Sequence, residues 1–434
     1  MAERVLLKIA VLSDFHIGAK KRSPREEDPF TQAKEAFEQA VQLGAEIILV
    51  SGDIFDRRTP SQEVWAKAMK ILRHPLSESE GQVKLVDTIG KKKEDISPLA
   101  LRGVPVIGIY GNHERRGRDL VDPIDTLEAA GLLIKLNQNA LVLETSSEKI
   151  AIHGMGYVPE EETRNVIKIW NPKPVKDAYN ILMIHQSLGQ FTYEKEEKTI
   201  LTPGDLPKGF DLYVSGHVHY KAKSEIHGKP LLFPGGTFRT QLLPVESEVP
   251  KGFYMIELNE EPSCEFIELK SVRDFFYVEK EFNGETISEV EEWINEKVKE
   301  LLNKPRKNKE KKPLARLRLK GNLAKGDGRE ELNSEKLLEK YSNKLILHIS
   351  KRELISPSLK EETQFLQDLR DQKIPLEEMT MKVLKSKLDE INYDNMFDVD
   401  TVYELLAENR EDKALQRITE TIDSLTRSET EEKE

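Results

Sequence analysis

Five short apolar runs in the first half of the chain each end in a group of polar residues. The runs are rich in β-branched residues, as the buried strands of a parallel sheet are, and they cover residues 7–12, 47–50, 106–110, 181–184 and 212–214. The polar groups after them are Asp14-Phe15-His16, Gly52-Asp53, Gly111-Asn112-His113-Glu114, His185 and Gly216-His217-Val218-His219. Because α/β sheets gather their sites in loops at the carboxyl ends of strands, we expect these side chains to converge across about 200 positions of sequence.

Helical patterns alternate with these runs over residues 1–264. One apolar stripe spans residues 30–43, where Ala33, Phe37 and Ala40 share a face and Gly44 follows as a stop signal. A second pattern begins at Pro60-Ser61, and a third covers residues 124–132. Alternating strands and helices joined by short loops are typical of α/β domains, so residues 1–264 are predicted to form one.

The pattern changes after Cys264. Residues 275–278, 314–319 and 345–349 are predicted strands, and residues 287–302 and 334–341 are predicted helices. This order predicts a small α+β domain over residues 265–352. Residues 353–376 contain the turn-forming segment Ser356-Pro357-Ser358 and are predicted to be a linker with some helix.

The last segment, residues 377–434, is acidic and carries two amphipathic helical patterns. It holds 8 Lys and Arg against 17 Asp and Glu, so most of the net charge of −11 lies here. The apolar stripes consist of Met381, Leu384, Leu388 and Ile391, and of Leu415, Ile418, Ile422 and Leu425. Each stripe is too isolated to be a core by itself, so the helices are predicted to bind a partner or to form an internal hairpin, and the preceding linker and the acidity favour a partner. Residues 428–434 are expected to be disordered.

Composition restricts the environment of the chain. Cys264 is the only cysteine, which excludes internal disulfide bonds and a thiolate metal cluster and fits a reducing cytoplasm. No run approaches the roughly 18 uninterrupted apolar residues needed to cross a bilayer, so no membrane association is expected. The net charge of −11 argues against a passive nucleic-acid coat, although the rest of the chain is nearly neutral and can carry local basic patches.

The polar groups have the chemistry of a two-metal site. Imidazole, carboxylate and amide ligands without sulfur suit divalent ions such as Mn²⁺, Fe²⁺ or Zn²⁺. Seven ligands shared between two ions require a bridging carboxylate, and Asp53 is the natural candidate because each of its oxygens can bind a metal. Two ions about 3.5 to 4 Å apart can activate a water and neutralise the charge that builds on a phosphoryl group, which predicts hydrolysis of a phosphate ester. His113, beside Asn112, is the candidate general acid.

Basic residues directly follow three of the polar groups. They are Lys20, Lys21 and Arg22, then Arg57 and Arg58, then Arg115, Arg116 and Arg118. Lysine and arginine at the rim of a cleft would position a polyanionic backbone, so contact with DNA phosphates is the functional hypothesis. The alternative is that these residues are solvated loop charges.

The five polar groups resemble the signature of the calcineurin-like metallophosphoesterases, which reads D-x-H, G-D, G-N-H, a lone H and G-H-x-H in this order. Within that family, Gly52-Asp53-Ile54-Phe55-Asp56 followed by Thr59-Pro60-Ser61 resembles the SbcD-type double-strand-break repair nucleases, as found in archaea. The resemblance implies a four-layer α/β sandwich with two central β-sheets flanked by helices. It also implies a small α+β capping domain and a C-terminal helical region that binds an ATPase.

The resemblance also implies roles for individual residues. Asp14, His16, Asp53 and His219 would hold one Mn²⁺, and Asp53, Asn112, His185 and His217 would hold the other. His113 would be the catalytic histidine of a manganese-dependent 3′-to-5′ exonuclease and endonuclease. Some relatives carry His where this chain has Asp56, and many carry Asp where it has Glu114.

The family implies partners as well as a reaction. Its members act on the ends of double-stranded DNA, work as homodimers and associate with a coiled-coil ATPase of the SbcC type. The apolar helix that contains Val64, Trp65, Met69 and Leu72, together with the helix near Leu127, would help to form the dimer interface, although core packing is the simpler explanation.

Two rival functions remain at this stage. The first is another metallophosphoesterase, such as a phosphoprotein phosphatase or a nucleotide phosphodiesterase. The additional domain and the partner-seeking tail argue against it, because a small substrate needs neither. The second is a scaffold that retains the fold and mainly recruits the ATPase to DNA ends, against which the intact ligands and His113 argue.

Overall fold

The computed structural model describes residues 7–77, 83–117, 120–145, 147–192, 201–258, 262–356, 367, 371, 375–390, 398–407 and 410–420. The chain divides into two compact units. The first is drawn from residues 1–278, 297–318 and 334–349, and the second from residues 279–296, 319–333 and 350–434.

The first unit contains a six-stranded sheet in the order β13-β12-β1-β2-β4-β5. Strands β1, β2, β4 and β5 are parallel, whereas β12 pairs antiparallel with both β1 and β13. The bounds are β1 Leu7–Leu12, β2 Ile47–Val50, β4 Val106–Gly108, β5 Ile134–Lys135, β12 Gly252–Leu258 and β13 Ser263–Glu268.

A second, seven-stranded sheet has the order β10-β11-β9-β8-β7-β6-β3. Strands β7, β8, β9 and β11 are parallel, and β10, β6 and β3 join antiparallel at the sides. The bounds are β3 Lys84–Ile89, β6 Asn139–Glu144, β7 Lys149–Met155, β8 Tyr179–His185, β9 Leu212–Gly216, β10 Ala222–Ile226 and β11 Lys229–Phe233. Both sheets are therefore mixed, and their central strands are parallel.

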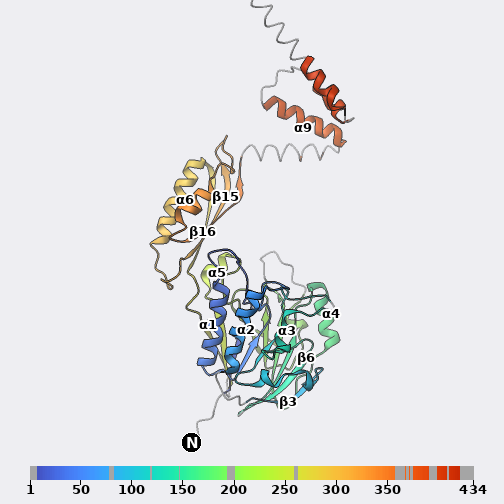
Figure 1. The fold of residues 1–434 in the computed structure, drawn as a ribbon, viewed down its shortest axis with the longest axis vertical. Helices are drawn as coiled ribbons and strands as arrows, with labels where there is room; N and C mark the ends of the chain where they lie inside the picture. Colours follow the sequence, from blue (N-terminus) through green and yellow to red (C-terminus); the bar gives the residue numbers. More distant parts are fainter. Residues whose placement is uncertain are drawn as a thin grey trace, which may run out of the picture. The chain divides into compact units, whose positions relative to one another are not determined.

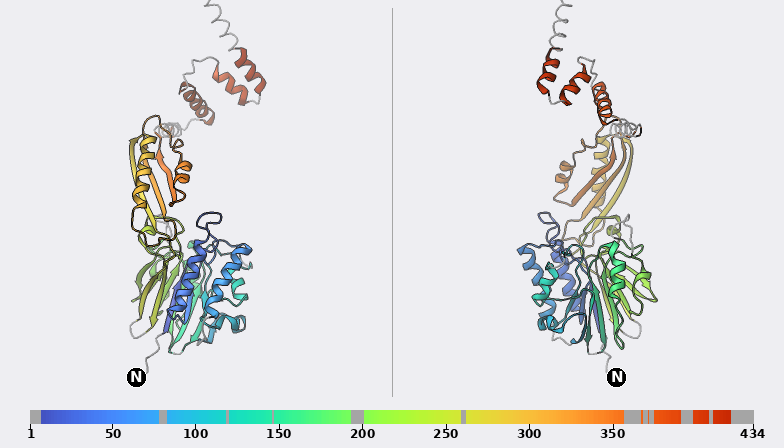
Figure 2. Two further views of the ribbon diagram at one scale, coloured as in Figure 1. Left: turned by 60° about the vertical axis from the view of Figure 1, so that its left-hand side comes forward. Right: turned by 90° about the vertical axis from the view of Figure 1, so that its right-hand side faces the viewer.

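The alternation of side chains along each strand builds the layers. Ile9 and Ile47 on the first sheet and Ile152 and Met183 on the second share one buried cluster, so the two sheets pack face to face. The opposite face of the first sheet packs on helices α1 (Asp28–Gln42), α2 (Gln62–Ser77) and α3 (Pro123–Ala129). Helix α4 (Glu160–Trp170) covers the other face of the second sheet. The result is the expected four-layer α/β sandwich, in which Figures 1 and 2 show α1 beside α2.

Strands β14 (Phe275–Glu285), β15 (Leu314–Leu323) and β16 (Ile346–Ile355) form a three-stranded sheet in this order. Helices α6 (Ile287–Leu302) and α7 (Ser334–Tyr341) lie between them in sequence. The strands and helices predicted after Cys264 are therefore all present. The compact units divide this segment, so β15 runs from the first unit into the second.

The shorter elements complete the described chain. They are helix α5 (Pro244–Glu248) and the 3₁₀ turns η1 (Lys93–Asp95), η2 (Pro98–Leu101) and η3 (Pro203–Asp205). Among the described residues, no helix combines the length and the apolar character that a membrane span requires.

The C-terminal segment contains α9 (Leu376–Glu390), α10 (Val399–Ala407) and further helix at residues 411–420. Helix α9 carries Met381, Leu384 and Leu388 of the first predicted stripe, all half-buried. Leu415 and Ile418 of the second stripe lie on the last helix, where Leu415 is 65% exposed. Ile391, Ile422 and Leu425 lie outside the described residues. Helix α10 was not predicted.

Candidate metal centre

Both sheets of the sandwich deliver polar side chains to one place. Asp14 and His16 follow β1, Asp53 follows β2, and Asn112 to Glu114 follow β4. From the second sheet, His185 is the last residue of β8, and His217 and His219 follow β9. The predicted convergence at the carboxyl ends of the strands is what the structure contains.

The ligand loops adopt unusual backbone conformations. Asp14, His16, Asp53 and His217 have φ values of 50°, 47°, 52° and 79°, a left-handed region that residues other than glycine rarely enter. Backbone bonds hold two of them, because the Asp14 amide donates to the Gly52 carbonyl and the His16 amide donates to the Asp53 carbonyl, each over 3.0 Å. Such strain persists only where the surroundings enforce it, and it concentrates at functional sites.

Two glycines allow the loops to approach closely. A Cβ atom added at Gly52 would lie 2.3 Å from Nδ1 of His185, and one at Gly111 would lie 2.0 Å from Oδ1 of Asp53. Any side chain at either position would displace a predicted ligand. The glycines of the G-D and G-N-H groups are therefore required by packing.

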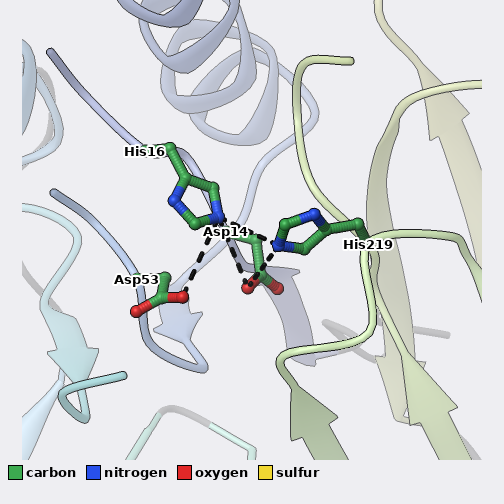
Figure 3. A group of neighbouring side chains, drawn as sticks. All are labelled: Asp14, His16, Asp53 and His219. Atoms are coloured by element: carbon green, nitrogen blue, oxygen red, sulfur yellow. Dashed lines mark hydrogen bonds and ion pairs between the residues drawn. The ribbon is translucent and has the colours of Figure 1, made fainter. Parts of the chain in front are cut away.

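The first cluster consists of Asp14, His16, Asp53 and His219, whose ligand atoms all lie within 4.8 Å of one another (Figure 3). Nε2 of His16 is 3.0 Å from Nε2 of His219, 3.8 Å from Oδ2 of Asp53 and 4.0 Å from Oδ1 of Asp14. Four ligands at about 2.1 Å from a common ion stand about 3 to 4.2 Å apart. These four atoms therefore have the spacing of a single metal site.

The second cluster is built around Asn112. Its Oδ1 lies 3.2 Å from Nε2 of His185 and 3.0 Å from Nδ1 of His217. Nε2 of His185 is also 3.4 Å from Oδ2 of Asp53, the same oxygen that faces His16. The structure thus brings all seven predicted ligands together as two groups that share one carboxylate oxygen.

The donor atoms fit divalent metals. Oδ2 of Asp14 and Oδ2 of Asp53 are buried and have no hydrogen-bond partner among the described residues. Nδ1 of His185 donates to the Ser51 carbonyl over 2.7 Å, which leaves the lone pair of Nε2 for an ion. A set of buried oxygen and nitrogen atoms that includes two carboxylates suits ions such as Mn²⁺, Fe²⁺ or Zn²⁺.

The electrostatics of the site also favour cations. Burial raises the pKa of Asp14 to about 7 and lowers the pKa of His16 to about 3. Burial also acts against the charged form of Asp53, but the neighbouring His185 and His16 hold the pKa of this carboxyl well below its usual range. Conversely, Asp53 overcomes the effect of burial on His185 and raises the pKa of that imidazole to about 9. A metal ion would replace the proton of His185 as the partner of Asp53.

His113 lies beside the first cluster and faces a pocket. Its backbone amide donates to Oδ1 of Asp53 over 3.0 Å, and Nδ1 of its ring donates to the Asp56 carbonyl over 2.9 Å. The ring stands edge-on to His16, with 4.6 Å between the ring centroids. The pocket has a volume of about 500 Å³ and is lined by His16, Ala19, Lys20, Asp56, His113, His219, Phe238, Thr240, Gln241 and Leu243.

This metal centre coincides with a known domain family. Residues 7–221 match the model of the calcineurin-like phosphoesterases, and this range contains all seven candidate ligands and His113. Residues 7–221 are therefore a calcineurin-like phosphoesterase domain. The predicted family and the predicted four-layer α/β fold are both confirmed, whereas the partner-binding helical region at residues 377–434 stays a prediction.

The chain is also similar to curated repair proteins along part of their length. It is 26% identical over 294 residues to the DNA double-strand break repair protein Mre11 of Methanopyrus kandleri, covering 63% of this chain and 59% of the relative. It is 27% identical to the double-strand break repair protein MRE11 of Arabidopsis thaliana and 25% identical to mus-23 of Neurospora crassa. Those alignments cover 63% of this chain and 43% and 40% of the relatives, so the chain spans roughly half the length of the relatives it matches.

Several residues that support the phosphoesterase site were not predicted. Glu114 is fully buried, and its two carboxylate oxygens accept the amides of Phe55 and Gly111 over 2.8 and 2.9 Å, which ties two ligand loops together. Its place directly after His113 was visible in the sequence, but its bonds were not. Thr240, whose Oγ1 is 2.6 Å from Nδ1 of His219, carried no sequence signal.

The candidate DNA-binding residues of the phosphoesterase domain separate into two groups. Lys20 is exposed but lines the pocket, where partial desolvation lowers its pKa. The pocket is not lined by the other six candidates, of which Lys21, Arg22, Arg57, Arg58 and Arg115 are exposed. Arg116 is half-buried and donates to the Val121 carbonyl over 3.1 Å. Arg118 lies outside the described residues.

Proposed function

We propose that this protein is a manganese-dependent DNA nuclease, with 3′-to-5′ exonuclease and endonuclease activity, that processes DNA ends in double-strand-break repair. The observation that carries the proposal is the pair of ligand clusters sharing Oδ2 of Asp53, beside His113 and an open pocket, in a phosphoesterase domain. The relatives named above, which are double-strand break repair proteins, support DNA as the substrate.

The residues present fit two Mn²⁺ ions. Asp14, His16, Asp53 and His219 would hold one, and Asp53, Asn112, His185 and His217 the other. When bound, such ions lower the pKa of a water and neutralise charge on the phosphoryl group during in-line displacement. The ion that such a site binds in the cell depends on the type of ligand atom and on metal availability as much as on affinity. The nitrogen and oxygen donors of this site suit Mn²⁺.

His113 is proposed to protonate the leaving oxygen of the scissile phosphodiester. Its Nδ1 is bound to the Asp56 carbonyl, so the proton for the leaving group is carried by Nε2. The backbone bond from His113 to Asp53 fixes the distance between this acid and the metal clusters. The ring also forms part of the pocket wall, where a phosphodiester would enter.

Lys20 is proposed to contact the phosphate that enters the pocket. Lys20 is exposed at the pocket wall, where its surroundings are less polar than bulk water and strengthen the attraction between its ammonium group and a phosphate. The exposed Lys21, Arg22, Arg57, Arg58 and Arg115 are proposed to contact the backbone farther along the DNA, and Arg116 is the weakest candidate because it bonds within its own loop.

We further propose the assembly that the family implies. The chain would form a homodimer through the surface of α2 that includes Val64 and Trp65, which are half-buried in one copy. Helix α9 and the helix at residues 411–420 would bind a coiled-coil ATPase of the SbcC type, with residues 265–352 as the capping domain and 353–376 as the linker. Because the protein would act on DNA ends, we propose that it works in the cytoplasm, near the nucleoid.

The test is cleavage of end-labelled linear duplex DNA by the purified protein with Mn²⁺. Wild type is compared with His113→Leu, and p-nitrophenyl phosphate esters serve as small substrates. The expected result is a ladder of shortened DNA that the variant does not produce. Efficient turnover of the small esters with intact DNA would instead support a phosphatase or a nucleotide phosphodiesterase.

A scaffolding role predicts a different ranking of variants in cells. If the protein mainly recruits the ATPase, His113→Leu leaves repair nearly intact, whereas removal of residues 377–434 abolishes it. For a nuclease, His113→Leu abolishes end processing although the protein still binds the ATPase. Co-purification of the ATPase with each variant separates the two.

A further inference from the structure

One loop connects the pocket wall to a metal ligand. Residues 239–243 follow β11, and Thr240, Gln241 and Leu243 of this loop line the pocket together with His113 and His219. Oγ1 of Thr240 is 2.6 Å from Nδ1 of His219. Nε2 of His219 faces the first cluster, so its lone pair would bind the ion. Nδ1 then carries the ring proton and donates a hydrogen bond to the Thr240 hydroxyl.

Two charged side chains hold the backbone of this loop from its two sides. Glu246 on α5 accepts the amides of Thr240, Gln241 and Leu242 over 3.2, 3.1 and 2.6 Å. Arg316 on β15 donates from Nη1 to the carbonyls of Gln241 and Leu242, each over 3.2 Å. The amides of residues 240–242 and the carbonyls of residues 241 and 242 are therefore bound by side chains from different parts of the chain.

The backbone of the loop is strained at Leu242. Its φ of 57° lies in the left-handed region, which a residue with a bulky side chain adopts only when its surroundings enforce it. The amide of Leu242 bonds to Glu246 and its carbonyl bonds to Arg316, so these two side chains enforce the conformation. Without Arg316, the carbonyls of Gln241 and Leu242 would lose these donors and would be free to turn.

Glu246 is secured independently of Arg316. Its Oε1 lies 2.8 Å from Nζ of Lys251, and both side chains are almost completely buried. Lys251 also donates to the His219 carbonyl over 2.6 Å. The backbone of His219 is thus fixed through Lys251, whereas its imidazole ring is oriented through Thr240 and the loop.

We propose that Arg316 is a positioning residue for the first metal ion, acting through residues 239–243 and Thr240 on the ring of His219. Arg316 lies on the part of β15 that belongs to the first compact unit, which also contains residues 239–243 and His219. The inference rests on the metal centre of the proposed function and on no property of DNA.

The experiment measures metal uptake directly. Full-length protein is stripped with a chelator and titrated with Mn²⁺ by calorimetry, with electron paramagnetic resonance to separate the two ions. Arg316→Met keeps the apolar stem of the side chain but has no donor, and Arg316→Lys keeps one donor group. Lys320→Ala is the matched control, because it removes a cation from the same strand. The ammonium group of Lys320 pairs with Glu279 and Glu353, which lie outside residues 239–243.

We expect Arg316→Met to lower the affinity for one of the two Mn²⁺ ions by about tenfold to a hundredfold. Loss of a residue that positions a metal ligand typically has an effect of this size. Arg316→Lys should show a smaller loss, and Lys320→Ala should match wild type. Thr240→Val should weaken the same ion as Arg316→Met. Because both residues act on one ring, the double variant should be no weaker than Thr240→Val alone.

The outcomes distinguish this inference from the proposed function. A wild-type protein that binds no Mn²⁺ would overturn the proposed metal centre itself. A wild type with two ions and an Arg316→Met variant with the same affinities would overturn only the role of Arg316, as would losses that multiply in the double variant. If circular dichroism shows Arg316→Met to be unfolded, Arg316→Lys decides, and wild-type affinity in that variant contradicts the inference.

Discussion

Asp53 has a different function for each of its carboxylate oxygens. Oδ1 accepts the amide of His113 and so fixes the candidate acid. Oδ2 faces His16 in one cluster and His185 in the other. The expectation from sequence was that each oxygen would bind one ion, whereas the geometry makes Oδ2 the shared atom.

At the scale of this residue, Asp53→Asn should abolish uptake of both ions while leaving the fold intact. The amide oxygen of asparagine can still accept the His113 amide, but the negative charge that holds two cations is gone. Metal stabilisation is worth several kcal/mol, so cleavage should fall by about a thousandfold or more. Calorimetry with Mn²⁺ and the DNA assay measure the two effects, with Asp87→Asn on exposed β3 as the control. Two ions bound to Asp53→Asn would show that Oδ2 is not the bridge.

At the scale of elements, the site depends on how closely three loops approach. Gly52 after β2 faces His185 at the end of β8, and Gly111 after β4 faces Asp53. Glu114 then ties the loop after β2 to the loop after β4 through two backbone amides. The strands set the distance between the loops, and the glycines and Glu114 set the contact.

Gly111→Ala is therefore expected to impair metal binding and also to destabilise the ligand loops. The new Cβ would lie 2.0 Å from Oδ1 and 2.6 Å from the backbone nitrogen of Asp53, so both the carboxylate and the backbone of this ligand must move. Gly117→Ala is the matched control in the same loop, because its Cβ would meet only Leu120, at an ordinary 3.7 Å. Mn²⁺ titration of both variants measures the difference, and equal affinities would show that Asp53 can shift without loss.

At the scale of the whole molecule, folding of the sandwich buries a group of ionisable side chains that come from both sheets. Oδ2 atoms of Asp14 and Asp53 have no hydrogen-bond partner among the described residues, and burial raises the pKa of Asp14. Ions that bind there bind only the folded chain. Metal uptake and unfolding are therefore linked.

Mn²⁺ should accordingly raise the melting temperature. At a hundred times the dissociation constant, one site adds about 2.7 kcal/mol to the free energy of unfolding, which corresponds to roughly 5 to 10 °C for a domain of this size. Differential scanning calorimetry with Mn²⁺ and with excess chelator measures the shift. Asp53→Asn should show no such shift, and an identical melting temperature for wild type in both buffers would contradict the linkage.

How much of this molecule could be predicted depends on the range of the interactions. The ligands were predictable because all seven lie at or just after the ends of five apolar strands, a local pattern. The pairing of Leu7 with Leu258 across the first sheet, and the bonds of Arg316 to residues 241 and 242, join segments far apart in sequence with no local signature. Helix α10 has only nine residues and was not predicted, because so short an apolar pattern does not distinguish a helix from a strand. The compact units divide strands that a sequence pattern treats as single elements.

The left-handed backbone at Asp14 and His16 bears on when the protein acquires its metal. The amides that hold these conformations bond to carbonyls of the loop after β2, not to ligand atoms. The loops after β1 and β2 therefore shape these two ligands without an ion, and metal loading can follow synthesis as a separate event. The metal supply of the cell at that moment then decides which ion occupies the centre. Growth in manganese-poor medium should therefore change the metal content of the purified protein without changing the amount of protein obtained.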